Sequence, residues 1–565
     1  MFSHAESLLV HFRHAEELKR AAVNYPHIDL NPRQLCDLEL LLNRAFYPLR
    51  GFLNQDDYQS VLDRMRLADG ILWPLPVCLD ISDQTARRLA PGQKVAINDE
   101  EGFMLAVLTV GDLWRPDKQR EALAIYGSDD PEAHPGVRQL LENTGDWYVG
   151  GDLEGLHLPP RYDFKDLRLT PAETARRFAQ NGWRRVIGFH TDDYLHCAHR
   201  EMLLRAAREH GANLLLQPVV GLEHPGNLDH YTHVRCHEEI VRKFPGQMAM
   251  LGLLTLASRG AGPREALWQA IIKKNFGCSH FLVADNHADP FACQPERGPF
   301  YPPGAAQELV RGHEAETGVV MVPVREMVYV EDRAQYLPRD EAGPELAIKT
   351  ISSAELKRRL THNLAIPDWF SYPEVVAELR RAFPPRSRQG FTVFLTGLSG
   401  SGKSTLAKVL LVKFLERRDR PVTLLDGDIV RRNLSSELTF SQEHRNLNVT
   451  RIGFVASEIT KNGGIAICAP IAPYEESRRA NRELIGRYGG YIEVYVSTPL
   501  TVCEQRDRKG LYAKARAGKI KGVTGITDPY VPPSHPELTI DTSDTTPAEG
   551  AQEILLYLAE QGYLP

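Results

Sequence analysis

Cysteine is scarce in this sequence, and the few cysteines are scattered. The 565 residues include eight cysteines, and no two of them form a C-x-x-C pair. This spacing argues against a disulfide framework and against a cysteine-based zinc site, and it favours reduced thiols. Long apolar runs are missing as well, because the most apolar window, residues 248–257, is too short to span a bilayer.

A strong excess of either charge and a secretory signal are also absent. The net charge of −6 gives no reason to expect nucleic acid or an anionic membrane surface as a partner. The N-terminal region, with Glu6, Glu16 and Glu17, lacks the apolar core of a signal peptide. Charged residues make up 25% of the chain and hydrophobic residues 42%, as in ordinary globular proteins. We therefore expect a soluble cytoplasmic protein without membrane or nucleic-acid partners.

Prolines and basic residues mark the clearest domain boundary. Residues 383–390 combine a proline pair with a polar basic stretch, directly before a new apolar run. A softer boundary lies at 157–172, where prolines again interrupt the chain. A chain of this length suits several domains, each with its own core. We predict three, at residues 1–165, 166–385 and 390–565.

The order of apolar patterns predicts an α/β protein over most of the chain. Short apolar runs and turns in the first domain indicate that it is β-rich. In residues 170–322, helical patterns alternate with strands such as 185–189 and 280–284, which is typical of a doubly wound parallel sheet. A short helical extension follows, and the third domain starts with another apolar strand at 391–396.

A glycine-rich phosphate loop follows that strand. It fits G-x-x-x-x-G-K-[ST], and a helical apolar pattern at 406–414 comes next, so a chance glycine turn is a poor explanation. Backbone N–H groups of such a loop surround phosphate oxygens; Lys403 would reach the β- and γ-phosphates of ATP, and Ser404 would hold Mg²⁺. The predicted nucleotide-binding residues are Gly397, Leu398, Ser399, Gly400, Ser401, Gly402, Lys403, Ser404 and Thr405.

Two carboxylates, Asp426 and Asp428, end the next apolar strand. The carboxyl ends of parallel strands gather beside the phosphate loop, where carboxylates can orient Mg²⁺ or accept a proton from an attacking hydroxyl. The alternative is a surface turn, since Asp-Gly-Asp is good turn chemistry, but the neighbouring loop favours a catalytic role. Several cations that could bind phosphate or sulfate oxygens follow later in the chain. Taken alone, any one of them is more simply explained as a solvated charge. They are Arg431, Arg445, Arg451, Arg478, Arg506, Arg508 and Lys509.

Four segments after the phosphate loop have a characteristic order: 425–431, 440–448, 471–474 and 507–516. Together with the loop they closely resemble adenylylsulfate (APS) kinase, and the similarity covers residues 390–565 almost whole. The resemblance implies a P-loop kinase fold and ATP-dependent phosphorylation of the 3′-hydroxyl of adenosine 5′-phosphosulfate (APS).

The resemblance also implies roles for single residues. Lys403 and the loop would hold ATP, Asp426 would orient or deprotonate the 3′-hydroxyl, and Asp428 would assist at the metal and substrate. The implied substrate-binding residues are Arg431, Phe440, Arg445, Asn448, Ile471 and Lys509, with Phe440 stacked on adenine and Lys509 on a lid. Two positions depart from the family: Ala472 replaces a serine, which excludes a phosphoserine there, and Val523 replaces a phenylalanine.

Residues 1–385 resemble a second family. Segments 38–52, 73–76, 148–151, 261–268 and 366–371 are similar to ATP sulfurylase (sulfate adenylyltransferase). These are mostly scaffold positions, so they indicate the fold more than the activity. The resemblance implies a PUA-like first domain and a nucleotidyltransferase-like second domain. Sulfurylases and APS kinases commonly assemble, so we expect a homo-oligomer.

The site positions of this second family differ. Where the family has Gln-Thr-Arg-Asn-Pro, the chain reads His190-Thr191-Asp192-Asp193-Tyr194, and where it has Gly-Arg-Asp-His, the chain reads 284–287 as Ala-Asp-Asn-His. The two arginines expected to bind sulfate are therefore Asp192 and Asp285. The histidines of the family persist as His196, His199 and His287, although His-x-x-His is more often helix packing than a ligand site.

Sulfate is a dianion, so exchanging arginine for aspartate removes an attraction and adds a repulsion. We favour an active APS kinase fused to a sulfurylase-like domain that is inactive or impaired. One alternative is a bifunctional enzyme that makes 3′-phosphoadenylyl sulfate (PAPS) from sulfate, with Arg259 and Arg264 replacing the lost arginines. The other is a regulatory nucleotide-binding protein without turnover, against which the complete kinase motif set argues.

Overall fold

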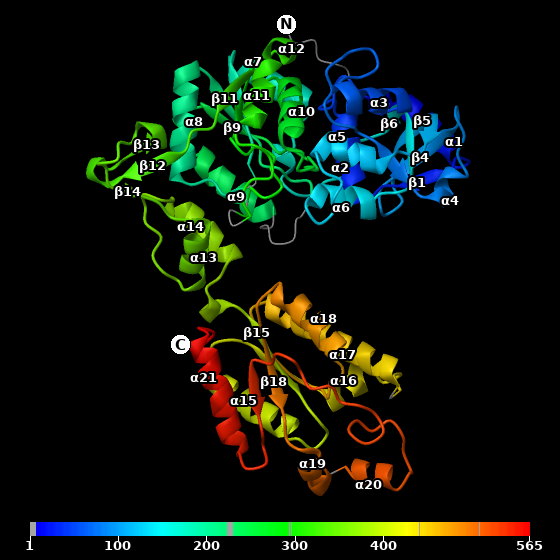
Figure 1. Cartoon of the computed structure of the whole chain (residues 1–565), viewed down its shortest axis with the longest axis vertical. Coiled ribbons are helices and arrows are strands. Elements are labelled where there is room, and N and C mark those ends of the chain that lie inside the picture. Colours follow the sequence, from blue (N-terminus) through cyan, green and yellow to red (C-terminus); the bar gives the residue numbers. More distant parts are fainter. Residues whose placement is uncertain are drawn as a thin grey trace. The chain divides into compact units, whose positions relative to one another are not determined.

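The computed structural model divides the chain into two compact units (Figure 1). The first comprises Met1–Ser352 and Ile366–Ala382, and the second comprises Ser353–Ala365 and Phe383–Pro565. The structure describes residues 7–191, 193–222, 230–292, 294, 297–439, 441–507 and 509–564. Within these residues, no helix is both long enough and apolar enough to cross a membrane.

A six-stranded sheet forms the N-terminal part of the first unit. Its order is β1-β4-β5-β6-β2 with β3 beside β6; β1 and β4 run parallel and the other pairs antiparallel. The strands are β1 (His27–Asp29), β2 (Gly51–Phe52), β3 (Leu79–Ile81), β4 (Lys94–Asn98), β5 (Met104–Trp114) and β6 (Trp147–Gly155). The helices are α1 (Phe12–Ala22), α2 (Pro32–Leu42), α3 (Gln55–Arg64), α4 (Asp83–Ala86), α5 (Lys118–Tyr126) and α6 (Pro135–Glu142). The β-rich prediction is confirmed.

The second fold of this unit is a five-stranded parallel sheet with the order β11-β10-β7-β8-β9. Because the strand order reverses between β7 and β10, the sheet is doubly wound with its switch point there, as predicted. The strands are β7 (Val186–Phe189), β8 (Asn213–Leu216), β9 (Ala249–Leu251), β10 (His280–Val283) and β11 (Val320–Pro323). The helices are α7 (Pro171–Gln180), α8 (Cys197–His210), α9 (His230–Val241), α10 (Gly262–Asn275), α11 (Ala305–Gly312) and α12 (Glu314–Thr317).

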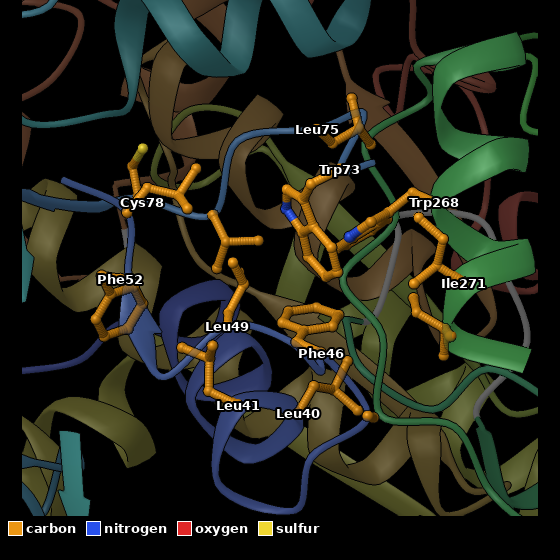
Figure 2. Close-up of a cluster of buried hydrophobic side chains, with 14 of the residues drawn as sticks. Leu40, Leu41, Phe46, Leu49, Phe52, Trp73, Leu75, Cys78, Trp268 and Ile271 are labelled. Atoms are coloured by element: carbon orange, nitrogen blue, oxygen red, sulfur yellow. The ribbon is translucent and has the colours of Figure 1, made fainter. Parts of the chain in front are cut away.

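The two folds of the first unit share one core. Phe46 packs against two buried tryptophans: its ring centroid lies 5.8 Å from that of Trp73 and 4.9 Å from that of Trp268 on α10 (Figure 2). All three side chains are fully buried. Burying aromatic rings this large stabilises a fold by several kcal/mol, so the N-terminal sheet and the α/β sheet support each other.

A small antiparallel sheet and two helices complete the chain before the kinase-like part. The sheet consists of β12 (Met327–Val330), β13 (Gln335–Pro338) and β14 (Ile348–Lys349). Of the two following helices, α13 (Ser353–Thr361) belongs to the second unit and α14 (Pro373–Ala382) to the first, where it packs against α9. The helical extension expected in residues 166–385 thus contributes one helix to each unit.

The second unit is built on a parallel sheet with the order β16-β17-β15-β18-β19. Helices α15 and α21 cover one face, and α17 and α18 the other (Figure 1). The strands are β15 (Phe391–Thr396), β16 (Val422–Asp426), β17 (Ile465–Ala469), β18 (Gly490–Val496) and β19 (Leu538–Ile540). The helices are α15 (Lys403–Arg417), α16 (Gly427–Leu434), α17 (Gln442–Lys461), α18 (Glu475–Gly486), α19 (Leu500–Arg506), α20 (Leu511–Arg516) and α21 (Pro547–Glu560).

Alternation along β15 explains its central place in this sheet. Phe391, Val393 and Leu395 belong to the core under α15 and α21, whereas Phe394 belongs to the core under α17 and α18. All six residues of the strand are buried. Successive strand residues point to opposite faces, so a strand covered by helices on both faces is apolar throughout.

Candidate functional site

The phosphate loop lies between β15 and α15, as predicted. Gly397, Gly400 and Gly402 have φ angles of +147°, +78° and +100°. A Cβ atom on Gly397 would lie 2.5 Å from the carbonyl oxygen of Val496, so no other residue fits there without a shift. The glycines allow the backbone to turn tightly and leave the N-terminus of α15 open toward the loop.

Lys403 folds back into this loop. Its Nζ donates to the carbonyl oxygens of Gly397 and Leu398, at 2.8 and 2.7 Å, and the side chain is 6% exposed. Burial lowers the pKa of Lys403 to about 8. The ammonium group is therefore held by neutral carbonyls, and a triphosphate entering the loop would supply the missing negative charge.

Ser404 and Asp426 bring two hard oxygen ligands together. The Ser404 hydroxyl donates to Asp426 Oδ2 at 2.8 Å, which connects α15 with the end of β16. The other oxygen of Asp426 accepts from the backbone N–H of Asp428 at 3.0 Å and so caps α16. A serine hydroxyl and a carboxylate are ligands that Mg²⁺ takes beside nucleotide phosphates, so these residues fit the ion.

Asp428 has a different partner. It is exposed at the start of α16 and forms an ion pair with Lys509, which lies between α19 and α20. This contact joins the acidic strand end to the segment predicted to act as a lid. Arg508, next to Lys509, lies outside the described residues.

The two predicted substrate arginines are held by carbonyl groups and, for Arg445, also by a hydroxyl and a carboxylate. Arg431 donates to the carbonyl oxygens of Leu438 and Thr439 at 2.9 and 3.2 Å. Arg445 donates to Thr524 Oγ1 at 2.9 Å and to the Gly522 carbonyl, and forms a 2.9 Å ion pair with Asp528. Burial, and then the proximity of Arg445, lowers the pKa of Arg431, so the two guanidinium groups concentrate positive charge.

Asn448 carries a buried polar atom that suits a ligand. It lies one turn after Arg445 on α17, is 7% exposed, and its Oδ1 has no hydrogen-bond partner among the residues that the structure describes. Buried polar atoms are nearly always satisfied, so an unpaired one next to a buried arginine fits a bound molecule with hydrogen-bond donors. Phe440, predicted to stack on adenine, lies outside the described residues.

The segment after β17 reaches the same edge of the sheet. Asp426 of β16 is in register with Ala469 of β17, so Ile471 follows directly beside the acidic strand end. The amide of Gly397 donates to the Ile471 carbonyl at 3.3 Å. The structure therefore brings the phosphate loop, the carboxylates and Ile471 together at one carboxyl edge, as the sequence predicts.

Some residues that shape the loop were not predicted. Arg506 Nη1 donates to Thr542 Oγ1 at 2.7 Å, and Thr542 Oγ1 donates to the Ser401 carbonyl at 2.8 Å. Thr498 Oγ1 also donates to Ser401, at 3.1 Å. Arg506 was visible in the sequence as one of several cations, whereas the two threonines belong to no motif and could not be singled out.

The sulfurylase-like residues form two pairs near the switch point of the first sheet. His190 follows β7 and lies 5.2 Å, between ring centroids, from His287, which follows β10. His287 Nε2 contacts Gln269 Oε1 at 2.6 Å. Burial lowers the pKa of His287 to about 4 and that of His190 well below its usual value, so both rings are neutral at pH 7.

His196 and His199 form the second pair. His199 Nδ1 accepts from the backbone N–H of His196 at 3.1 Å, which caps α8, and His196 Nδ1 lies 2.9 Å from Ser371 Oγ. Burial lowers the pKa of His196 to about 3. These two histidines therefore cap the N-terminus of α8, whether or not they also contact a ligand.

Two aspartates, Asp192 and Asp285, are the residues that we predicted at the sulfate-binding arginine positions of the family. Asp285 is exposed and follows β10 by two positions, at the carboxyl edge of the sheet. Asp193 is exposed after β7, and Asp192 lies outside the described residues. Of Asp192 and Asp285, only Asp285 belongs to the described residues, and its carboxylate lies near the switch point.

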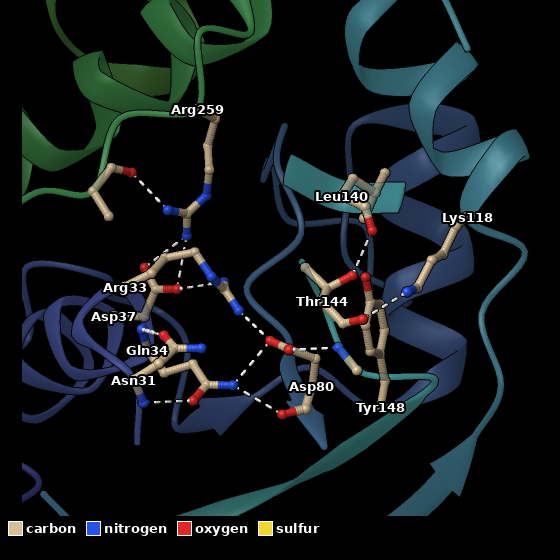
Figure 3. A network of polar contacts seen from close by, with 12 residues as sticks. Asn31, Arg33, Gln34, Asp37, Asp80, Lys118, Leu140, Thr144, Tyr148 and Arg259 are labelled. Atoms are coloured by element: carbon tan, nitrogen blue, oxygen red, sulfur yellow. Dashed lines mark hydrogen bonds and ion pairs between the residues drawn. The ribbon is translucent and has the colours of Figure 1, made fainter. Parts of the chain in front are cut away.

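Arg259 and Arg264, the candidates to replace the lost arginines, have other partners. Arg259 Nη2 lies 2.7 Å from both oxygens of Asp37, which also accepts from Arg33 (Figure 3). Arg264 donates to the carbonyl oxygens of Val61, Leu62 and Pro74 at 3.1 to 3.4 Å. Both guanidinium groups hold the N-terminal fold to the α/β fold, and breaking such contacts would leave buried charges unpaired.

Lys273 is buried close enough to His190 and His287 for its charge to add to the effect of burial, which lowers the pKa of both histidines. Its Nζ donates to Gln217 Oε1 at 2.8 Å, the side chain is fully buried, and burial lowers its pKa to about 7. A buried ammonium group that donates to a neutral amide destabilises the fold at low pH.

Replacing Lys273 with methionine is expected to remove a pH dependence from the first unit. In the wild type, the folded pKa of about 7 lies below the unfolded value of 10.5. The cost of burying the charge is complete below pH 7, and stability rises with pH up to 10.5, because the unfolded chain holds the proton longer. Between about pH 7 and pH 9 the wild type should gain about 2 kcal/mol relative to Lys273→Met. Chemical denaturation at both pH values measures the free energy of unfolding of each protein. If the difference between wild type and Lys273→Met is the same at both pH values, the prediction is wrong.

The architecture and the site together define the class. The second unit has the fold of a P-loop kinase, and the first has a nucleotidyltransferase-type α/β fold preceded by a mostly antiparallel sheet. Comparison with known families agrees: the PUA-like domain matches residues 4–158, ATP-sulfurylase matches residues 165–382 and adenylylsulphate kinase matches residues 389–541.

Similar proteins cover the whole chain. A sulfate adenylyltransferase of Mycosarcoma maydis is 47% identical over 97% of this chain and 96% of its own length. A sulfate adenylyltransferase of Coccidioides immitis is also 47% identical, over 98% of this chain and 96% of its own length. Among solved structures, a hexameric APS kinase from Thiobacillus denitrificans has a TM-score of 0.81 and 40% identity, covering 99% of this chain and 98% of its own. The chain therefore belongs to the sulfate adenylyltransferase family, with an adenylylsulphate kinase domain fused after the sulfurylase domain.

Proposed function

We propose that this protein phosphorylates the 3′-hydroxyl of APS with ATP, giving PAPS and ADP. The contact between Ser404 Oγ and Asp426 Oδ2 carries this proposal, because it sets the metal-binding hydroxyl of the phosphate loop beside the candidate base. The charged residues around it suit phosphoryl transfer, which depends mainly on positioning and on charge stabilisation.

The phosphate loop and the acidic strand end would have separate roles in the reaction. The loop N–H groups and Lys403 would bind the triphosphate, and Lys403 would exchange the carbonyls of Gly397 and Leu398 for phosphate oxygens. Asp426 would take the proton of the 3′-hydroxyl while that oxygen attacks the γ-phosphorus and the bond to ADP breaks. Mg²⁺, held by Ser404 and Asp426, would neutralise charge on the phosphates. Asp428 would assist at the metal, and Lys509 would close over both nucleotides.

The binding of APS would use the face of α17 and the segment after β17. Arg445 and Asn448 would bind the phosphosulfate with Arg431, Ile471 would line the site, and Phe440 would stack on adenine. Ala472 has no hydroxyl, so the phosphoryl group would pass directly from ATP to APS without a covalent intermediate at this position.

Formation of ADP that depends on APS tests this function. The purified chain with Mg²⁺ and ATP should release ADP when APS is added and should convert APS to PAPS. Absence of turnover with purified APS would refute the kinase function and would leave a regulatory nucleotide-binding protein.

We further propose that the sulfurylase-like half does not form APS at a useful rate. The support is the exposed carboxylate of Asp285 at a position where the family resemblance implies a sulfate-binding arginine, together with Arg259 and Arg264, which are engaged with Asp37 and with carbonyl groups. The neutral histidines add no positive charge to offset it.

A bifunctional PAPS-forming enzyme is the second candidate, because the curated relatives are called sulfate adenylyltransferases. A measurement of ATP formation from APS and pyrophosphate distinguishes the bifunctional enzyme from a kinase with an inactive sulfurylase-like half. We expect none above background, and robust formation would establish the bifunctional enzyme.

Returning arginine to both acidic positions is expected to improve sulfate binding. Asp192→Arg with Asp285→Arg should tighten it about tenfold or more, since each unit charge contributes roughly 4 kcal/mol at 4 Å and an effective dielectric near 20, before solvent reduces it. Calorimetric titration with sodium sulfate measures the change. Asp129→Arg with Asp332→Arg, both on the exposed surface, matches the change in net charge and should leave binding unaltered. Equal affinities of the two double variants would show that charge inversion is not the cause.

We also propose that the chain assembles into a homo-oligomer. The support is the structural relative that covers 99% of the chain, which is called hexameric. The cytoplasmic location and the exact domain boundaries stay predictions.

A further inference from the structure

Thr396, the last residue of β15, connects the phosphate loop to the segment that follows β17. Its hydroxyl lies 2.8 Å from the carbonyl oxygen of Ile471, 3.3 Å from that of Ala472 and 2.9 Å from Tyr530 Oη. A hydroxyl has one proton to donate, and the carbonyls can only accept it, so the phenol of Tyr530 donates to Thr396. The side chain of Thr396 is fully buried.

The segment that Thr396 contacts has an unusual backbone. Ala472 has a φ of +45°, in the left-handed region, and is 1% exposed. A residue with a Cβ persists in this region only where the surrounding structure over-determines it, and such residues cluster at ligand sites. Here the neighbouring groups hold Ile471–Tyr474 from several directions, including the bond from the Gly397 amide to the Ile471 carbonyl.

Arg478 supports the same segment from the helical side. Its Nη1 donates to the Ala472 carbonyl at 2.6 Å, and its Nη2 to the Val531 carbonyl at 2.9 Å. The side chain is 1% exposed, and its Nε lies 3.1 Å from Glu493 Oε1 on β18. The Val531 amide in turn donates to the Pro473 carbonyl at 2.9 Å. The guanidinium group thus fixes two neighbouring loops to the sheet.

We propose that Thr396 and Arg478 are positioning residues that preorganise Ile471–Tyr474 to bind APS, with Thr396 linking this segment to the ATP loop. The inference rests on the proposed function, in which Ile471 lines the APS site. Thr396 precedes Gly397, and both residues bond the Ile471 carbonyl, so the conformations of the two loops depend on one another. A segment held in its bound conformation loses less entropy when the ligand binds.

The ordinary alternative is that Thr396 is a satisfied polar residue of the core. Thr392 provides a matched control, because it lies four residues earlier on β15 and therefore on the same face of the sheet. It is also fully buried, and its hydroxyl bonds Thr460 Oγ1 at 2.8 Å, in α17 and not in the APS segment.

Valine at each position separates these readings. Thr396→Val and Thr392→Val should lower the unfolding temperature of the kinase unit to a similar degree. Only Thr396→Val should raise KM for APS, by about tenfold, which corresponds to one lost hydrogen bond, with a smaller change in KM for ATP. Thr396→Ser keeps the hydroxyl and should restore KM for APS. If Thr396→Val does not fold, Tyr530→Phe provides a second test. It removes the phenol group that donates to the Thr396 hydroxyl, and it should also raise KM for APS.

Two results would overturn the inference. One is a KM for APS that is the same in Thr396→Val as in Thr392→Val while the wild type turns over normally. The other is an equal rise of KM for ATP and for APS, which would show a general distortion of the phosphate loop. A wild type without APS-dependent turnover would instead refute the proposed function itself, so the two failures are distinguishable.

Discussion

Lys403→Ala is expected to lower kcat for APS phosphorylation by about three orders of magnitude, the cost of removing a preorganised charge from a transition state. The ammonium group is buried beside the loop carbonyls, and burial lowers its pKa to about 8, so it is poised to move onto an incoming phosphate. Alanine suits the helix of α15, and it removes the charge together with the methylene chain and the two hydrogen bonds to the loop. Steady-state kinetics of ADP release with saturating APS measure the loss.

The matched control is Lys408→Ala. Lys408 lies on the same helix but is exposed, so its removal changes the net charge equally without touching the loop. We expect wild-type kcat for this variant. A kcat of Lys403→Ala within tenfold of that of Lys408→Ala would mean that the loop does not bind the reacting phosphates.

Asp426→Asn is expected to lower kcat by about 10²- to 10⁴-fold, the range for loss of a positioned general base. Asparagine has nearly the same shape and is a good helix N-cap, so the bond from the Asp428 amide and the fold of α16 should persist. What disappears is the negative charge that accepts a proton and attracts Mg²⁺.

Asp419→Asn serves as the control for this variant. Asp419 precedes the opposite end of β16, where it pairs with Arg420 at 3.4 Å, and should have no effect on turnover. If Asp426→Asn retains near-wild-type kcat at saturating Mg²⁺, another group must take the proton. Raising the Mg²⁺ concentration distinguishes the two duties, because only a metal-binding defect is relieved by it.

Local motifs correctly predicted the place of the phosphate loop and of the acidic strand end in the fold. The phosphate loop, Asp426 and Asp428 follow strands whose apolar character is plain, and a parallel sheet necessarily brings its strand ends together. The partners of the cations could not be predicted. Arg445 contacts Gly522 and Thr524 across 77 and 79 residues of chain, and no periodicity in the sequence encodes such a pairing.

The first unit shows the same limit. Sequence patterns correctly placed a β-rich fold before a doubly wound one, but they suggested Arg259 as a free cation. Its partner Asp37 lies 222 residues earlier, so only the folded chain reveals that this arginine already has a carboxylate. Similarly, Phe46 and Trp268 join the two folds into one core, although a proline-rich boundary separates them in the sequence.

The placement of Thr396 illustrates a third kind of gap. In the sequence it is one more β-branched residue of a buried strand, and its β propensity explains its presence fully. Only the three-dimensional structure shows that its hydroxyl faces the segment after β17. Residues that act through neighbouring backbone carbonyls have no sequence signal, because carbonyls are present at every position.

We propose that the kinase site at Gly397–Thr405 is active and that the sulfurylase-like half is not. The most direct test is to supply the purified protein with ATP and Mg²⁺ and either APS or inorganic sulfate, with pyrophosphatase present, and to measure PAPS by chromatography. We expect PAPS from APS and none from sulfate. PAPS formed from sulfate at a comparable rate would contradict the proposal, because both halves of the chain would then be active.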